Sequence, residues 1–198
     1  MASPEQVLLE FYIENSPVQP FNWLQGRSFS EAFVICIGAG PWKFGRRKKI
    51  QGEALEKLGG RDISQLPKTE ACKFYPLDWQ NKFLYNSVCF INNYNISFEI
   101  FCKDLYNKEN VFFALNSIYS LAGAKGNPKV LSLFCRDGLQ LPSFPIDRHV
   151  KRKLTELKLP TEEFDMISLC NSVGINPRDA AVAFVRAASD MDNPDWSI

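Results

Sequence analysis

The sequence LAGAKGNPKVLSLFCR at residues 121–136 and the sequence PIDRHVKRKL at residues 145–154 carry the strongest structural signals in the chain. The first predicts two short helices joined by a tight turn, because Gly123 and Gly126 interrupt an otherwise apolar pattern. Such a turn exposes backbone N–H groups that bind phosphate, although it can also be a plain corner that needs glycine for its backbone geometry. The second sequence places Asp147 directly before a run of helical periodicity, which is the position of a helix N-cap.

Helical patterns also dominate the rest of the chain. Residues 28–31 (Ser-Phe-Ser-Glu) have capping-box spacing before the apolar run at residues 33–37. Alternating strand patterns, internal repeats and linkers rich in Gly and Ser do not occur in the sequence. We therefore predict an all-α fold, a single unit over residues 1–198, built as one compact body or as two helical lobes. Further helices are expected over residues 4–15, 52–58, 77–93, 97–106, 110–121, 130–135 and 161–171 and from residue 177 onward.

Composition narrows the class of protein. The 198 residues include 16 Phe, 6 Tyr and 4 Trp, and 45% are apolar, which excludes a mainly disordered chain. The 23 Lys and Arg residues nearly balance 22 Asp and Glu, so a globally basic nucleic-acid-binding protein is excluded but a locally basic one is not. The longest apolar stretch, residues 32–39, is far shorter than the ~20 residues of a membrane-spanning helix. With no CxxC pair and no signal-peptide pattern, we expect an intracellular protein of the cytoplasm, nucleoid or nucleus without membrane contact.

The two motifs together resemble the helix-hairpin-helix DNA glycosylase superfamily (HhH-GPD). In that family, a Leu-Pro-Gly-Val-Gly-x-Lys hairpin is followed by the motif Val-Asp-x-His-Val-x-Arg. Residues 146–152 match the second motif closely, and residues 121–129 match the first loosely, with two extra residues in the turn. The resemblance implies an all-α glycosylase fold with the active site between its lobes. It places the helix-hairpin-helix at about residues 111–136 and the aspartate loop and its helix at residues 141–158.

Carried over residue by residue, the resemblance makes Lys129 the nucleophile and Asp147 its catalytic partner, eighteen residues later as in the family. Lys125 is the alternative nucleophile. A lysine attacks a sugar C1′ as a neutral amine, and we expect burial beside Leu131 and Phe134 to favour that form of Lys129. An ionised Asp147 would stabilise positive charge on the sugar and help to activate the lysine. The alternative role of Asp147 is that of a simple helix cap.

The C-terminal sequence refines the expected substrate. Asp192 and Trp196 have the four-residue spacing of an Asp and a base-stacking Trp in the short archaeal-type 8-oxoguanine DNA glycosylases, which the chain resembles most. A Trp face stacks on a flipped purine, and a carboxylate accepts hydrogen bonds from the purine edge. Gln25 and Phe134 are further candidates for the base pocket. The alternatives are an acidic tail with an incidental Trp and, for Gln25, a solvent-facing loop amide.

DNA contact must come from local charge, because the net charge is only +1. Basic side chains gather at residues 46–49 and 151–153, although a solvated loop is the alternative interpretation of the first run. Only Cys170 follows Asp147, so the four-cysteine iron–sulfur loop of endonuclease III cannot form. We expect no cofactor and no catalytic metal, although the resemblance allows a monovalent cation on the hairpin carbonyls. The residues expected to contact DNA are Gly123, Lys125, Gly126, His149, Lys151, Arg152, Arg46 and Arg47.

The resemblance leads to one functional expectation and two alternatives. The protein is expected to be a bifunctional DNA glycosylase and AP lyase of base excision repair that flips an oxidised purine, above all 8-oxoguanine, out of duplex DNA. It would act as a monomer, excise the base through a Schiff base on Lys129 and nick the strand by β-elimination. The first alternative is a monofunctional glycosylase in which Asp147 activates a water molecule. The second is a non-enzymatic helix-hairpin-helix module that binds DNA structures.

Overall fold

The computed structural model of the chain describes residues 2–16, 23–41, 43–108, 110–125 and 128–189. Helices account for the regular structure of these segments, and no strand occurs in them. The all-α prediction is therefore confirmed. None of the helices in the described segments has the length and apolar character needed to cross a bilayer.

Eleven α-helices follow one another along the described segments, with a π-helical turn (Phe134–Gly138) directly after the eighth. Where the sequence predicts a helix, its bounds agree to within about two residues, except in the region 44–58. The short α4 has no predicted counterpart. The helices are α1 (Pro4–Asn15), α2 (Phe29–Gly38), α3 (Phe44–Leu58), α4 (Lys68–Ala71), α5 (Asp78–Tyr94), α6 (Phe98–Asn107), α7 (Val111–Leu121), α8 (Lys129–Leu133), α9 (Arg148–Glu156), α10 (Glu163–Ser172) and α11 (Pro177–Ser189).

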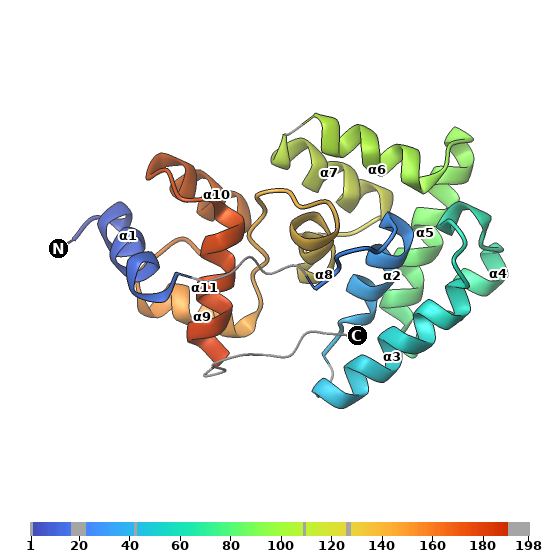
Figure 1. Cartoon of the computed structure of the whole chain (residues 1–198), viewed down its shortest axis with the longest axis horizontal. Helices are drawn as coiled ribbons and strands as arrows, with labels where there is room; N and C mark the ends of the chain where they lie inside the picture. The colour runs from blue at the N-terminus through green and yellow to red at the C-terminus, as the bar shows by residue number, and fades with distance from the viewer. Residues whose placement is uncertain (1, 17–22, 42, 109, 126–127, 190–198) are drawn as a thin grey trace.

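The helices form two groups, with α8 between them (Figure 1). Helices α2 to α7 make up the first group, in which α2 packs against α3, α5 and α6. In the second group, α1 packs against α10 and α11, and α11 packs against α9. Phe11 of α1 stacks on Phe184 of α11 with ring centroids 4.2 Å apart. The second group therefore combines α1 with α9, α10 and α11, which lie far from it in the sequence.

Helix α2 is the buried centre of the first group. The Ser28 hydroxyl accepts a hydrogen bond from the Glu31 N–H, and the Glu31 carboxylate accepts one from the Ser28 N–H, which is the predicted capping box. Residues 33–37 are fully buried, so this helix is apolar on all sides. Three buried side chains hold its C-terminal end by donating hydrogen bonds to carbonyl oxygens, namely Tyr75 to Val34, Gln51 to Ile35 and Gln80 to Ile37.

Helix α3 begins at Phe44, so the predicted short helix over residues 52–58 is wrong at its start. The basic run at residues 46–49 lies on the first turns of this helix and not in a solvated loop. Lys and Arg are good helix formers, and the helix buries an apolar stripe against its neighbours, which outweighs the low helix propensity of Gly52. The buried stripe consists of Ile50, Ala54 and Leu58.

The turn between α7 and α8 begins as its glycine pattern predicts. Gly123 has a φ of +60°, in the left-handed region that favours glycine, and its N–H donates a hydrogen bond to the Ser120 carbonyl. The side-chain amide of Asn86, on α5, donates a hydrogen bond to the Ala122 carbonyl at 3.0 Å. A Cβ atom at position 123 would lie 2.5 Å from Nδ2 of Asn86. The backbone conformation therefore favours glycine here, and a side chain would displace the Asn86 amide from its hydrogen bond to Ala122.

Candidate active site

Lys129 and Asp147 form the central contact of the candidate site. The Nζ atom of Lys129, the first residue of α8, donates a hydrogen bond to Oδ2 of Asp147 at 2.8 Å. The Lys129 side chain is 38% exposed and the Asp147 side chain 23%, so solvent reaches the pair. The structure thus brings together the two residues to which the resemblance assigns the chemistry.

Asp147 is also the N-cap of α9. Its Oδ1 atom accepts hydrogen bonds from the N–H groups of His149 and Val150, both at 2.9 Å. Burial by itself would raise the pKa of the Asp147 carboxyl, but the Lys129 ammonium and the two N–H donors bring this pKa below its ordinary value. The cap does not use the oxygen that faces Lys129. The two roles that the sequence offers as alternatives for Asp147 are therefore compatible.

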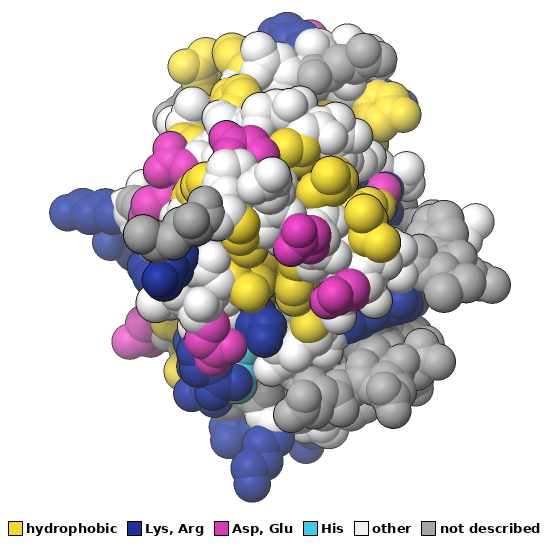
Figure 2. Space-filling model, turned by 90° about the vertical axis from the view of Figure 1, so that its left-hand side faces the viewer, with side chains coloured by type: hydrophobic (Ala, Val, Ile, Leu, Met, Phe, Trp, Pro, Cys, Tyr) yellow, Lys and Arg dark blue, Asp and Glu magenta, His cyan; other side chains and the backbone are white. Residues whose placement is uncertain are grey.

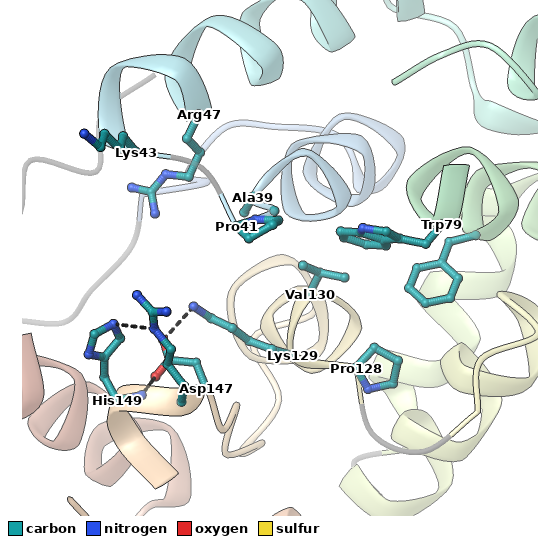
Figure 3. A pocket seen from close by; sticks show the side chains of 13 residues that line it. Ala39, Pro41, Lys43, Arg47, Trp79, Pro128, Lys129, Val130, Asp147 and His149 are labelled. Atoms are coloured by element: carbon teal, nitrogen blue, oxygen red, sulfur yellow. Dashed lines mark hydrogen bonds and ion pairs between the residues drawn. The ribbon is translucent and has the colours of Figure 1, made fainter. Parts of the chain in front are cut away.

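A pocket of about 870 Å³ opens beside this pair. Figure 3 shows Lys129 and Asp147 at one end of the pocket and Trp79 at the other. The walls come from segments far apart in the chain, namely residues 39–41 after α2, the start of α3, the first turns of α5 and the starts of α8 and α9. Its volume lies in the range of clefts that bind small molecules and cofactors.

The end of the pocket near Lys129 carries more positive than negative charge. Lys43, Arg47, Lys129 and Arg148 line it, and Asp147 is the one carboxylate among its described lining residues. Burial lowers the pKa of the Arg47 guanidinium, which still keeps its charge at neutral pH because arginine titrates far above that range. Charge of one sign concentrated in a concave surface attracts ligands of the opposite sign. The lining therefore favours an anionic ligand.

The other end of the pocket is aromatic. Trp79 and Phe83 project from α5 with ring centroids 5.5 Å apart and planes at 69°. Pro41 and Pro128 extend this apolar wall (Figure 3). A partly exposed Trp offers a flat face on which a planar ring can stack. The pocket thus combines surfaces for an anionic group and for a planar ring.

Basic side chains also cover the exposed side of α9. Figure 2 shows Lys and Arg side chains around the single histidine, His149. Lys151 and Arg152 are exposed, as contact with DNA would require. Their nitrogens lie 3.5 Å from a carboxylate oxygen of Glu162 and 3.8 Å from one of Glu156, respectively. Exposed ion pairs of this length are weak, so both cations can exchange these partners for a polyanion.

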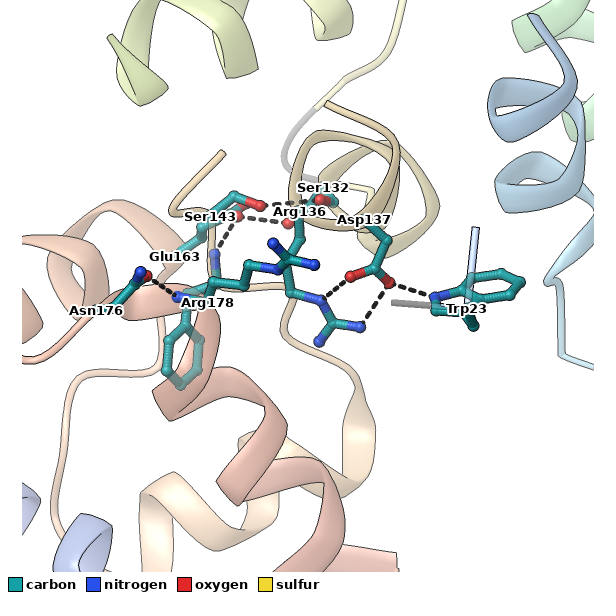
Figure 4. Close-up of polar contacts among 9 residues, drawn as sticks. Trp23, Ser132, Arg136, Asp137, Ser143, Glu163, Asn176 and Arg178 are labelled. Carbon is teal, nitrogen blue, oxygen red and sulfur yellow. Dashed lines mark hydrogen bonds and ion pairs between the residues drawn. The ribbon is translucent and has the colours of Figure 1, made fainter. Parts of the chain in front are cut away.

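Two buried charged groups lie close to α8 (Figure 4). Arg136 and Asp137, neighbours in the π-helical turn, form a two-point ion pair with distances of 2.7 and 2.8 Å. The indole N–H of Trp23 donates to the same Asp137 carboxylate at 2.7 Å. The second group is Glu163 of α10, which accepts a hydrogen bond from the Ser132 hydroxyl of α8. Both groups therefore connect the region of the Lys129 helix to other segments.

The structure removes Phe134 from the predicted base pocket. Its ring is fully buried and packs against Phe33 at a centroid distance of 5.0 Å, because the π-helical turn contacts α2. The expected burial of Lys129 is also wrong, since Phe134 fills the core while the Lys129 side chain lines the pocket. Gln25 is exposed in the turn at residues 23–26 and does not line the pocket, in agreement with the solvent-facing alternative.

We expect Phe134→Ala to lower the free energy of unfolding by about 3–5 kcal/mol, because the lost ring leaves a cavity in the core. Gln25→Ala, at an exposed turn, should change it by no more than about 0.5 kcal/mol. Urea denaturation followed by circular dichroism measures both values. A small effect of Phe134→Ala, similar to that of Gln25→Ala, would show that the ring does not support the core.

The other predicted site residues fall into three classes. His149 lines the pocket, and its Nε2 atom accepts a hydrogen bond from Nε of Arg148 at 3.1 Å. Lys125 and Arg46 are exposed and do not line the pocket, which leaves them as candidates for contact with DNA outside it. Three predictions lie outside the described residues, those for Gly126, Asp192 and Trp196.

Sequence reasoning missed several residues that the structure brings to the site. Trp79 and Phe83 have the i, i+4 spacing of one helix face, and a Trp on the first turn of a helix was the signal available for them. Lys43 directly precedes α3, and the late predicted start of that helix concealed its position. No local signal distinguishes Glu163 from an ordinary acidic residue in the first turn of a helix.

We expect the Asp147 carboxylate to contribute to stability above the ordinary pKa of an Asp and to lose that contribution in acid. Because the folded-state pKa is lowered, the stabilisation is complete above about pH 5 and disappears as pH falls below about 4. The free energy of unfolding of Asp147→Asn should lie below that of the wild type at pH 6 and approach it at pH 3. Asn keeps the N-cap, so the comparison isolates the charge. A difference that stays constant from pH 6 to pH 3 would contradict this expectation.

Comparison with known proteins adds no further assignment, because no protein-family model, curated protein or solved structure matches the chain. Within the described segments, His, Cys, Asp and Glu side chains do not form a group of three or more that could hold a metal ion. The function is therefore argued from the site and from the sequence motifs.

Proposed function

We propose that this protein is a bifunctional DNA glycosylase and AP lyase that excises an oxidised purine, 8-oxoguanine above all, from duplex DNA. The observation that carries the proposal is the 2.8 Å contact between the Lys129 amine and the Asp147 carboxylate at the wall of an open pocket. The facing carboxylate can take a proton from the lysine when a substrate enters the pocket, which leaves the neutral amine that attacks an electrophilic carbon. The two motifs that resemble the helix-hairpin-helix glycosylases contain these same two residues.

In the proposed reaction, Lys129 attacks C1′ of the damaged nucleotide as a neutral amine. A bond forms between Nζ and C1′, the glycosidic bond breaks, and its electron pair leaves with the base. The proton that Lys129 loses passes by way of Asp147 to the departing base. The sugar ring then opens, with a proton taken up by its oxygen, to give a Schiff base on Lys129. Loss of the C2′ proton expels the 3′ phosphate, and water finally releases the lysine.

The residues around the pair support a nucleic-acid substrate. Lys43, Arg47 and Arg148 can neutralise phosphates on either side of the attacked sugar, and the exposed cations of α9 extend this surface. Trp79 offers a stacking face at the other end of the same pocket. The monomeric state and the intracellular location remain parts of the proposal that no contact in the structure supports, and a monovalent cation at the hairpin is allowed only by the resemblance.

The preference for an oxidised purine also rests on the sequence, on the spacing of Asp192 and Trp196. One observation favours the monofunctional alternative: Asp147 is held as an anion beside the pocket, which suits activation of a water molecule as well as of an amine. In that mechanism Lys129 would only bind phosphate. The two routes differ in whether a covalent intermediate forms.

The test exposes the wild-type protein to four duplexes that carry one 8-oxoguanine, one uracil, one abasic site or no lesion, with and without borohydride. We expect base release, a 3′ nick and a trapped adduct with 8-oxoguanine, and an adduct with the abasic site. Base release without an adduct would replace the proposal by the water-using mechanism. Binding without base release from any duplex would replace it by the DNA-binding module.

A further inference from the structure

A single buried carboxylate connects the segments that carry Lys129 and Asp147. Glu163, on the first turn of α10, is only 3% exposed. Its Oε1 atom accepts hydrogen bonds from the Ser132 hydroxyl and from the Phe144 N–H, the latter at 3.1 Å. Its Oε2 atom accepts one from the Tyr119 hydroxyl of α7 at 2.6 Å. Figure 4 shows Glu163 facing Ser132 across the gap between α10 and α8.

The two donors to Oε1 stand close to the catalytic pair along the chain. Ser132 follows Lys129 by one helical turn on α8, and Phe144 precedes Asp147 by three residues. Regular structure alone does not set the distance between these segments, because the helical run of α8 and the π-helical turn ends at Gly138 and residues 139–147 form no helix. A second contact, from the Ser143 hydroxyl to the Ser132 carbonyl at 3.0 Å, joins the same two segments.

Burying a carboxylate costs free energy, but a buried carboxylate can accept hydrogen bonds from several segments, which an apolar side chain cannot do. Burial raises the pKa of Glu163, and the three donors together with the charge of Arg136 offset only part of this rise. One carboxylate oxygen can accept from two segments at once, which fixes both against a common point. An apolar residue of the same volume would fill the space without setting the distance between them.

We propose that Glu163 is a positioning residue, which through Oε1 holds α8 and the segment before α9 at the separation that lets Lys129 reach Asp147. Its importance for catalysis rests on the proposed function. The geometry that it controls does not, because the Lys129–Asp147 contact exists whatever the pair is used for. The competing explanation is that Glu163 only stabilises the fold and does not affect the Lys129–Asp147 pair.

Two matched substitutions separate these explanations. Ser132→Ala and Tyr119→Phe each remove one buried hydroxyl that donates to the same carboxylate. Ser132 of α8 donates to Oε1, which also accepts from the segment before Asp147. Tyr119 of α7 donates to Oε2 instead. Both variants should lose thermal stability, and Tyr119→Phe at least as much as Ser132→Ala, because Oε1 keeps the Phe144 N–H as a donor. Only Ser132→Ala should loosen the catalytic pair.

The first readout is the pKa of Asp147, measured by NMR with carboxyl-labelled aspartate. We expect it to rise toward its ordinary value in Ser132→Ala, as in a Lys129→Gln control, and to stay at the wild-type value in Tyr119→Phe. Glu163→Gln, which can place an amide oxygen at the Oε1 position, should keep the wild-type value. An unchanged pKa of Asp147 in Ser132→Ala would overturn the positioning role, with or without enzymatic activity.

The second readout is the single-turnover rate of borohydride trapping at saturating DNA. Ser132→Ala should reduce this rate by about tenfold or more with an unchanged affinity for DNA, because small misplacements of a nucleophile slow attack. Tyr119→Phe should stay within about twofold of the wild type. An equal reduction of the trapping rate in the two variants would mean that Glu163 only stabilises the fold. No trapping by the wild type would refute the proposed function and leave the NMR result to decide the positioning role.

Discussion

We expect Lys129→Gln to abolish covalent trapping of the protein on duplexes that carry 8-oxoguanine or an abasic site. Trapping requires a primary amine that forms a Schiff base with C1′, and Gln cannot form one. In the structure, the Nζ atom of Lys129 lies in the pocket at hydrogen-bond distance from a carboxylate. Gln at this position can still donate a hydrogen bond to Asp147, so the local structure should survive. The measurement is borohydride trapping resolved by denaturing gel, with the folded state of each variant checked by circular dichroism.

Two lysines provide matched controls for this result. Lys43 lines the same pocket, and Lys125 is exposed on the turn before α8. Lys43→Gln and Lys125→Gln should weaken binding to DNA, more at low salt than at high salt, and still give the adduct. If the adduct disappears in either of these variants and persists in Lys129→Gln, the nucleophile has been assigned to the wrong residue.

The second large effect should come from Asp147→Asn. We expect the rate of base excision to fall by about 10²–10⁴-fold, because the substitution removes the charge that stabilises the sugar cation and takes part in proton transfer. Asn preserves the N-cap of α9 through its amide oxygen, so the fold should be retained. Affinity for the damaged duplex should stay the same or increase, since a negative charge next to phosphates is lost.

Single-turnover kinetics and fluorescence anisotropy together test this expectation. Excision within about tenfold of the wild type would show that Asp147 serves chiefly as a helix cap. Trapping on a preformed abasic site is a useful companion measurement, because it does not require the glycosidic bond to break. A variant that traps at an abasic site and does not release 8-oxoguanine would place the role of Asp147 in the first step.

Much of the fold could be predicted because the information for it is local, whereas the proximity of Lys129 and Asp147 was expected only from the resemblance of the two motifs. Asp147 stands before a helix whose first turn supplies the two N–H groups that it caps, and Gly123 marks the end of α7 through its own backbone conformation. The capping box of Ser28 and Glu31 likewise marks the start of α2. Each of these signals involves residues within a few positions of one another, and each appears in the structure where the sequence places it.

The rest of the site depends on contacts between distant segments. Phe134 lies near Lys129 in sequence, and only the packing of the π-helical turn against α2 shows that its ring belongs to the core. Trp79 faces Lys129 across the pocket although it lies fifty residues earlier in the chain. Glu163 has the sequence context of any acidic residue at the start of a helix. Residues of this kind acquire their roles only when the groups of helices come together.

The pairing of α1 with the last helices bears on how the protein is made. During synthesis from the N-terminal side, Phe11 leaves the ribosome long before its stacking partner Phe184. Until α10 and α11 have been made, α1 lacks the helices that pack against it, whereas α2 to α7 can already form the contacts of their own group. Helix α1 can therefore pack only after α10 and α11 have been synthesised. Translation products that stop before them would leave α1 exposed to proteases and to chaperones.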